Sequence, residues 1–172
     1  LLNDTPFPDA SELFIRYDHY VTRVLTSAGI RLGDLGIPEL SGRPATATPR
    51  EVWRSFSENW HLYAGTASGY WLQNAFVALF GIDAAPDAEN ADALFDHIQE
   101  QLATEEFRPR ALFAQFGIEV LTTTDDPMDD LAAHAALAAE PSFSGRVLPT
   151  FRPDAYINPA APTWAANVAL LT

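Results

Sequence analysis

The sequence lacks cysteine and lysine altogether. Without cysteine among its 172 residues, the chain has no disulfide framework, thiolate metal site or cysteine nucleophile. Such a chain suits a reducing compartment, so we expect a cytoplasmic protein. The ten basic residues are all arginine and are scattered, and the formal net charge is −13. Because binding phosphates needs clustered positive charge, this balance argues against nucleic acid and acidic membranes as partners.

Long hydrophobic runs are also missing. No apolar run approaches the roughly 20 residues of a membrane span, and the start "LLNDTPFPDA" has no basic segment of a signal peptide. The start also lacks methionine, so we expect a piece of a longer protein. Hydrophobic residues nevertheless make up 48% of the chain, including four Trp and eleven Phe, which is enough for the core of one domain.

Residues 1–117 show the periodicity of successive helices. Asp18 is placed to cap the first helix, and "TPRE" at 48–51 has the pattern of a capping box. The Gly- and Pro-rich segment 30–47 is predicted to be a loop. Helices are predicted at about 18–28, 48–64, 68–80, 90–102 and 111–116. This pattern predicts a helical layer.

Residues 118–172 change to the pattern of a βαβ segment with a following helix. Short β-branched runs at 118–123 and 145–151 flank an Ala-rich helix predicted at 128–139. Strands joined in this way are parallel, with a right-handed crossover. The predicted fold is therefore mostly α with a short βαβ unit. Two strands need further partners, which again suggests an incomplete fragment.

Polar residues follow both predicted strands. "TTTDDP" ends the first and "FRPD" the second, which places Asp125, Asp126, Arg152 and Asp154 at one rim. The carboxyl ends of parallel strands are where ligands bind in such folds, so a functional site is expected there. In the alternative interpretation, Asp126 caps the next helix and "RPD" is a simple turn.

The stretch "RYDHYVTR" at 16–23 places His19 and Tyr20 together between two arginines. An imidazole titrates near neutrality and a phenol donates a hydrogen bond, so the pair suits general acid/base catalysis on a hydroxyl or carbonyl. In the alternative interpretation, Asp18 is only a cap, His19 is solvated, and Tyr20 is a packing residue.

The motifs together resemble the uronate (glucuronate) isomerase family of the amidohydrolase superfamily. The similarity runs through nearly the whole chain in four segments: "DHYVTRVLTSAGI" (18–30), "EVWRSFSENWHLYAGTASGYWLQNAFVALFGI" (51–82), "FRPRALFAQFGIEVLTTTDDPMDDLAAH" (107–134) and "VLPTFRPD" (147–154). The combination of "DHY", "TTDDP" and "PTFRPD" is specific, whereas each motif alone is weak.

The resemblance implies a (β/α)8 TIM barrel with a helical insertion at residues 1–117. It implies isomerisation of D-glucuronate to D-fructuronate and of D-galacturonate to D-tagaturonate, with a divalent metal, expected to be zinc. His19 and Tyr20 would be catalytic. The substrate-binding residues would be Arg23, Asp125, Asp126, Arg152 and Asp154. The partner is a small uronic acid, with no nucleic acid or membrane, and homo-oligomer formation is left open.

The chain departs from the family pattern at the metal site. The family's first strand carries a His-x-His pair, which this sequence lacks. His61 is interpreted as a packed residue, and His97 and His134 as helix surface, so no metal ligand is assigned. We expect the chain alone to be inactive, as the N-terminal portion of an isomerase. A non-catalytic helical binding or assembly module derived from the family remains the alternative.

Overall fold

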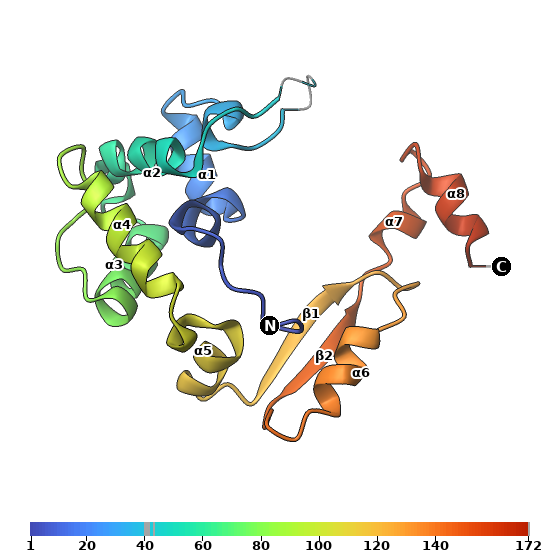
Figure 1. Ribbon diagram of the computed structural model, residues 1–172. Coiled ribbons are helices and arrows are strands. Elements are labelled where there is room, and N and C mark those ends of the chain that lie inside the picture. Colours follow the sequence, from blue (N-terminus) through green and yellow to red (C-terminus); the bar gives the residue numbers. More distant parts are fainter. Residues whose placement is uncertain (40–41, 43, 172) are drawn as a thin grey trace. The chain divides into compact units, whose positions relative to one another are not determined.

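The computed structural model describes residues 1–39, 42 and 44–171 (Figure 1). The chain divides into two compact units. Residues Pro6–Arg108 form the helical unit, and Leu1–Thr5 with Pro109–Thr172 form the βαβ unit. Within the described ranges, no helix has the length and apolar character needed to cross a bilayer.

The described residues of the helical unit form the α-helices α1 (His19–Ser27), α2 (Pro49–Glu58), α3 (Ala67–Phe80) and α4 (Ala91–Leu102). Shorter helical turns lie at Glu12–Arg16, Leu32–Leu35, Trp60–Tyr63 and Glu105–Phe107. The predicted mostly helical character is confirmed. The turn at Leu32–Leu35 interrupts the predicted loop 30–47, in which positions 40, 41 and 43 lie outside the described residues.

Helix ends follow local side-chain chemistry. The Asp18 carboxylate accepts hydrogen bonds from the backbone N–H groups of Tyr20 and Val21, at 2.8 and 3.2 Å, and so caps α1. Thr48 and Glu51 form the predicted capping box at the start of α2. The extension of this helix to about residue 64 is wrong, because the α-helix ends at Glu58 and the chain tightens into a 3₁₀ turn.

Aromatic rings fill the core of the helical unit. Trp53 is fully buried, its ring centroid lies 5.3 Å from that of Phe56, and its indole N–H donates to the Ala91 carbonyl at 2.9 Å. The Tyr63 hydroxyl donates to the Val21 carbonyl at 2.8 Å. Burial, with a smaller effect of the Asp18 charge, raises the pKa of Tyr63. The phenol therefore stays neutral and ties α1 to the core.

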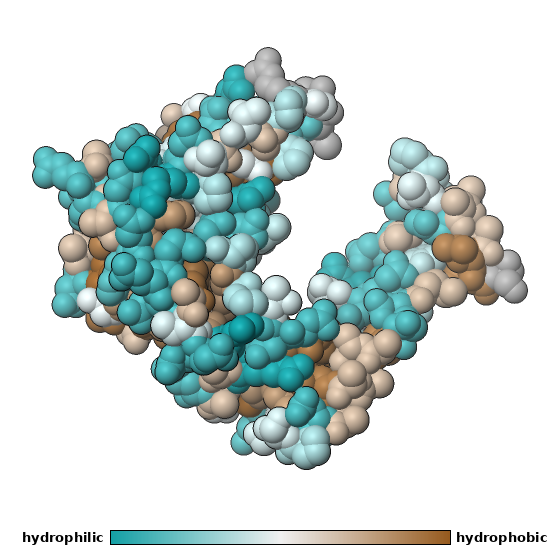
Figure 2. Space-filling model, viewed as in Figure 1, coloured by the Kyte–Doolittle hydropathy of each residue, from teal (hydrophilic) through white to brown (hydrophobic). Residues whose placement is uncertain are grey.

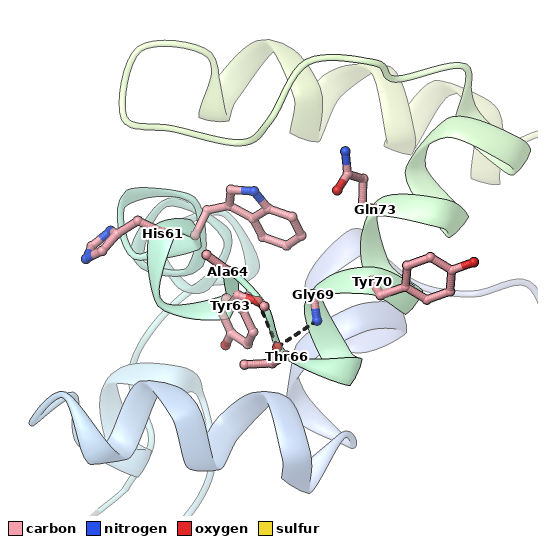
Figure 3. Close-up of a pocket in the computed structure, with 9 residues that line it drawn as sticks. His61, Tyr63, Ala64, Thr66, Gly69, Tyr70 and Gln73 are labelled. Atoms are coloured by element: carbon pink, nitrogen blue, oxygen red, sulfur yellow. Dashed lines mark hydrogen bonds between the residues drawn. The ribbon is translucent and has the colours of Figure 1, made fainter.

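Gly69 in α3 is packed against the preceding turn (Figure 3). A Cβ atom there would lie 2.2 Å from the Tyr63 carbonyl oxygen, so the backbone would have to move. Gly→Ala in a helix normally stabilises by about 1 kcal/mol, but we expect Gly69→Ala to destabilise by about 2 kcal/mol. Thermal unfolding measures this change. Asn74→Ala, at an exposed position of the same helix, is the control; a Gly69→Ala protein at least as stable as the parent would contradict this packing.

The βαβ unit contains two strands, β1 (Val120–Asp125) and β2 (Arg146–Phe151), joined through α6 (Ala132–Ala138). The strands are parallel, as predicted, with Val120 opposite Arg146 and Asp125 opposite Phe151. The unit also contains α5 (Pro109–Gln115), α7 (Asp154–Ile157) and α8 (Trp164–Ala169).

The structure corrects the start of the crossover helix. It begins at Ala132 and not near residue 128, after Leu131, which has a positive φ of 54°. Asp126 is therefore not its N-cap. Its carboxylate instead accepts from the Met128 backbone N–H at 2.9 Å, in a local turn. The alternative interpretation of Asp126 as a helix cap is wrong, so this side chain is left at the end of β1.

The two faces of β1 differ. Leu121, Thr123 and Asp125 are half-buried, and Thr123 contacts α6, whereas the alternate residues Thr122 and Thr124 are exposed. In Figure 2, hydrophilic residues cover most of the visible surface of the helical unit, while hydrophobic residues reach the surface over the βαβ unit. One face of the sheet is thus covered by α6, and polar residues lie at the carboxyl ends of both strands.

Candidate functional site at the carboxyl ends of the strands

The predicted rim residues gather at the carboxyl ends of β1 and β2. Asp126 Oδ1 accepts a hydrogen bond from the Tyr156 hydroxyl at 2.6 Å. Arg152 Nε donates to Asp154 Oδ2 at 3.0 Å. One open groove is lined by Thr124, Asp125, Asp126, Arg152, Asp154 and Ala155. The structure therefore brings the four predicted residues of this unit together.

Two carboxylates of this groove, those of Asp126 and Asp154, are held in their charged form. The Tyr156 hydroxyl, followed by the Met128 N–H, lowers the pKa of Asp126. The Arg152 guanidinium lowers the pKa of Asp154. Of the five N–H donors of Arg152, only Nε lies on Asp154 among the described contacts, and the side chain is half-exposed. The terminal NH2 groups of the guanidinium, its outer fork, can therefore donate hydrogen bonds to a ligand carboxylate, while the aspartates can accept hydrogen bonds from ligand hydroxyl groups.

Tyr156 was not predicted from the sequence, and its contact gives a direct test. We expect Tyr156→Phe to raise the pKa of Asp126, because the variant lacks the hydroxyl that stabilises the carboxylate. Because the pKa of Asp126 is lowered in the folded protein, its charged carboxylate stabilises the fold at pH values above the unfolded-state pKa, and this stabilisation is lost as the pH falls. The variant lacks part of this stabilisation, so it should lose less stability on acidification. NMR titration of the Asp126 side-chain carbon measures this shift; an unchanged pKa would contradict the contact.

Asp125 has a different environment from Asp126. Its Oδ2 accepts from the Thr123 hydroxyl at 2.7 Å, and its Oδ1 lies 3.7 Å from His134 Nε2. The side chains of His134 and Asp125 are only 10% and 13% exposed. The interpretation of His134 as helix surface is therefore wrong. Because side chains alternate along a strand, Thr123 and Asp125 share one face of β1, but no sequence pattern indicated His134 opposite them.

His19, Tyr20 and Arg23 lie on α1 in the helical unit. His19 and Tyr20 are exposed in its first turn, with ring centroids 4.1 Å apart. Tyr20 is 55% exposed, so its interpretation as a packing residue is wrong, whereas the Asp18 cap is confirmed. His19 and Arg23, four residues apart, line a shallow groove together with Thr22 and Thr26. The three predicted side chains are thus free to meet a small molecule.

The remaining histidines do not form a metal centre. His61 is exposed beside a depression lined by Trp60, Thr66 and Tyr70 (Figure 3), so the prediction of a packed residue is wrong. His97 Nε2 lies 2.8 Å from the Phe80 carbonyl oxygen and is half-buried. Across residues 1–39, 42 and 44–171, no three His, Asp or Glu side chains are grouped to hold a metal ion.

Known proteins give a consistent comparison over the whole chain. The family model for glucuronate isomerase matches residues 1–172. A uronate isomerase from Corynebacterium efficiens is 54% identical over 99% of this chain and 36% of its own length. One from Rhizobium meliloti is 47% identical over 91% of this chain and 33% of its own. The chain spans about a third of the length of these curated relatives.

Solved structures agree with the fold. The crystal structure of glucuronate isomerase from Caulobacter crescentus has a TM-score of 0.87 and 41% identity, over 96% of this chain and 34% of the other. The uronate isomerase from Thermotoga maritima has a TM-score of 0.81 and 25% identity, over 98% and 35%. The fold of this chain is therefore similar to a part of each of these two structures.

Proposed function

The chain belongs to the glucuronate isomerase family, and we propose that the full-length protein isomerises D-glucuronate to D-fructuronate and D-galacturonate to D-tagaturonate. The observation that carries the proposal is the family match over every residue of the chain. Because the chain spans about a third of its relatives, the activity is assigned to the full-length protein. The non-catalytic module is not favoured.

We propose that β1, α6 and β2 are part of a (β/α)8 barrel, with residues 1–117 as a helical insertion and 118–172 as a barrel segment. The parallel strands and their helical crossover support this placement, since they are the repeating unit of such barrels. Reactions in barrels take place at the carboxyl ends of the strands, where Asp126, Arg152 and Asp154 lie.

Recognition of the uronate carboxylate is assigned to Arg152, with Arg23 as a second candidate. A guanidinium binds a carboxylate through two parallel N–H···O bonds, and this geometry distinguishes a uronate from the neutral sugar. Asp154 orients Arg152 through Nε and leaves its outer fork for the ligand. Asp126 and Asp154 are proposed to accept hydrogen bonds from sugar hydroxyls.

His19 and Tyr20 are proposed as the groups that handle protons. Aldose-to-ketose conversion removes the proton on C2 and delivers one to C1, while the hydroxyl proton on C2 leaves and the C1 oxygen is protonated. The enediolate between these steps carries negative charge on oxygen, which an O–H or N–H donor stabilises. An exposed imidazole beside an exposed phenol can supply both the proton carrier and the donor.

The divalent metal of the family, which we expect to be zinc, does not fit the described residues of this chain. A catalytic zinc site needs three protein ligands, and no such group is present in residues 1–39, 42 and 44–171. We propose the metal only for the full-length protein, since this chain covers about a third of the length of its relatives. Cytoplasmic location is proposed from the family resemblance.

Incubating the full-length protein with D-glucuronate or D-galacturonate tests the proposal. We expect NMR spectra to show conversion of each aldose to its ketose. D-Glucose, which carries a hydroxymethyl group in place of the carboxylate, is the matched control and should not react. Absence of ketose from both uronates would contradict the proposed function.

A further inference from the structure

The face of β1 that packs against α6 contains a polar chain that the proposed mechanism does not use. Thr123 Oγ1 lies 2.7 Å from Asp125 Oδ2 and 2.7 Å from His134 Nε2. Both ends of this chain are almost removed from solvent. Burying polar groups costs free energy unless they are hydrogen-bonded, and here each partner satisfies the next.

Hydrogen-bonding capacity fixes the direction of this chain. A hydroxyl has a single proton to donate, and a carboxylate only accepts. Thr123 therefore donates to Asp125, and its oxygen must accept from His134. The Nε2 atom of His134 thus carries a proton, and the order of donation is His134 to Thr123 to Asp125. His134, on α6, lies 11 residues after Thr123 in the sequence and holds the side chains of Thr123 and Asp125 in one orientation.

The polar chain ends at Asp125, which lines the groove beside Asp126. Asp125 is the last residue of β1, and Asp126, which follows it, presents its carboxylate in the groove. Anchoring Asp125 under the sheet fixes the peptide from which Asp126 projects. Tyr156 and the Met128 N–H hold Asp126 from the other side. A ligand-binding group held from two sides keeps its geometry without being reordered by the substrate.

We propose that His134 is a positioning residue: through Thr123 it anchors Asp125 and so orients Asp126 toward the sugar hydroxyls. In this proposal, the main role of Asp125 is to anchor the end of β1, and direct contact with the substrate is secondary. The inference rests on the proposed isomerase function. His134 itself touches no substrate, but its loss should weaken substrate binding.

Paired substitutions in the full-length enzyme test this role. His134→Leu and Thr123→Val remove the donor and the relay, and each is expected to raise KM about tenfold while kcat changes less than about threefold. His134→Gln retains an N–H donor and Thr123→Ser retains the hydroxyl, so both should stay within about twofold of the parent. The double variant with Leu and Val should be no worse than the poorer single variant, because the three groups act as one chain.

A control separates positioning from general stability. His97→Leu also removes a half-buried imidazole contact, on α4 in the helical unit, and should lower the unfolding temperature without changing KM. If His134→Leu and Thr123→Val retain the parental KM, or if the Gln and Ser variants fail to restore it, the inference is overturned while the isomerase function stands. Absence of turnover by the parent enzyme would overturn the proposed function and this inference together.

Discussion

Replacing Arg152 by alanine should lower kcat/KM for D-glucuronate by about 100-fold, with most of the loss in KM, because removing one partner of a charge-assisted pair costs several kcal/mol. The guanidinium lies at the carboxyl end of β2 and is oriented by Asp154. Arg152→Lys retains the charge but not the fork, so it should recover only part of the loss. Steady-state kinetics of the full-length enzyme measure both changes.

Arg146 offers a matched control for this prediction. It is an exposed arginine at the first residue of β2, whereas Arg152 follows the last residue of that strand. Arg146→Ala should change kcat/KM by no more than about twofold, as expected for a surface position away from the site. If Arg152→Ala and Arg146→Ala behave alike, the assignment of Arg152 to the uronate carboxylate is wrong.

The second large effect is expected at His19 and Tyr20. His19→Ala removes the imidazole and Tyr20→Phe removes only the hydroxyl, and each should lower kcat about 100-fold, the usual contribution of a positioned acid or base. Because both side chains are exposed, neither change should disturb the core. Circular dichroism spectra should match the parent, and kcat should fall more than KM rises.

His61 and Tyr70 are the controls for this pair. Both are exposed side chains of the helical unit, outside the groove that contains His19. His61→Ala and Tyr70→Phe should leave kcat within about twofold of the parent. Parental kcat in both His19→Ala and Tyr20→Phe would remove the acid/base assignment and leave α1 with a structural role only.

Local chemistry explains why the helices could be predicted. The cap at Asp18 and the capping box at Thr48 and Glu51 satisfy backbone groups within a few residues, so sequence spacing is enough to identify them. The parallel strands follow similarly from two apolar runs around a helix. Asp126 misled the prediction because an aspartate before proline suits a helix cap and a turn equally well.

The parts that were not predicted depend on contacts between distant residues. His134 is buried because Thr123 and Asp125 face it, and Tyr156 matters because Asp126 lies within 2.6 Å of its hydroxyl. Neither pairing has a spacing rule, since one depends on α6 packing against the strands and the other on where the chain places Tyr156 after β2. The opposite error at His61 has the same origin: its aromatic neighbours suggested burial, but the break after α2 turns it outward.

The central claim is isomerisation by proton transfer through an enediolate, and the fate of the C2 hydrogen tests it most directly. D-Glucuronate labelled with deuterium at C2 would be converted by the full-length enzyme in ordinary water, and the ketose analysed by NMR. We expect part of the label to be lost to water, because the proton is carried by an exchangeable side-chain group. Complete retention of deuterium at C1 would indicate a direct hydride shift and would contradict the roles given to His19 and Tyr20.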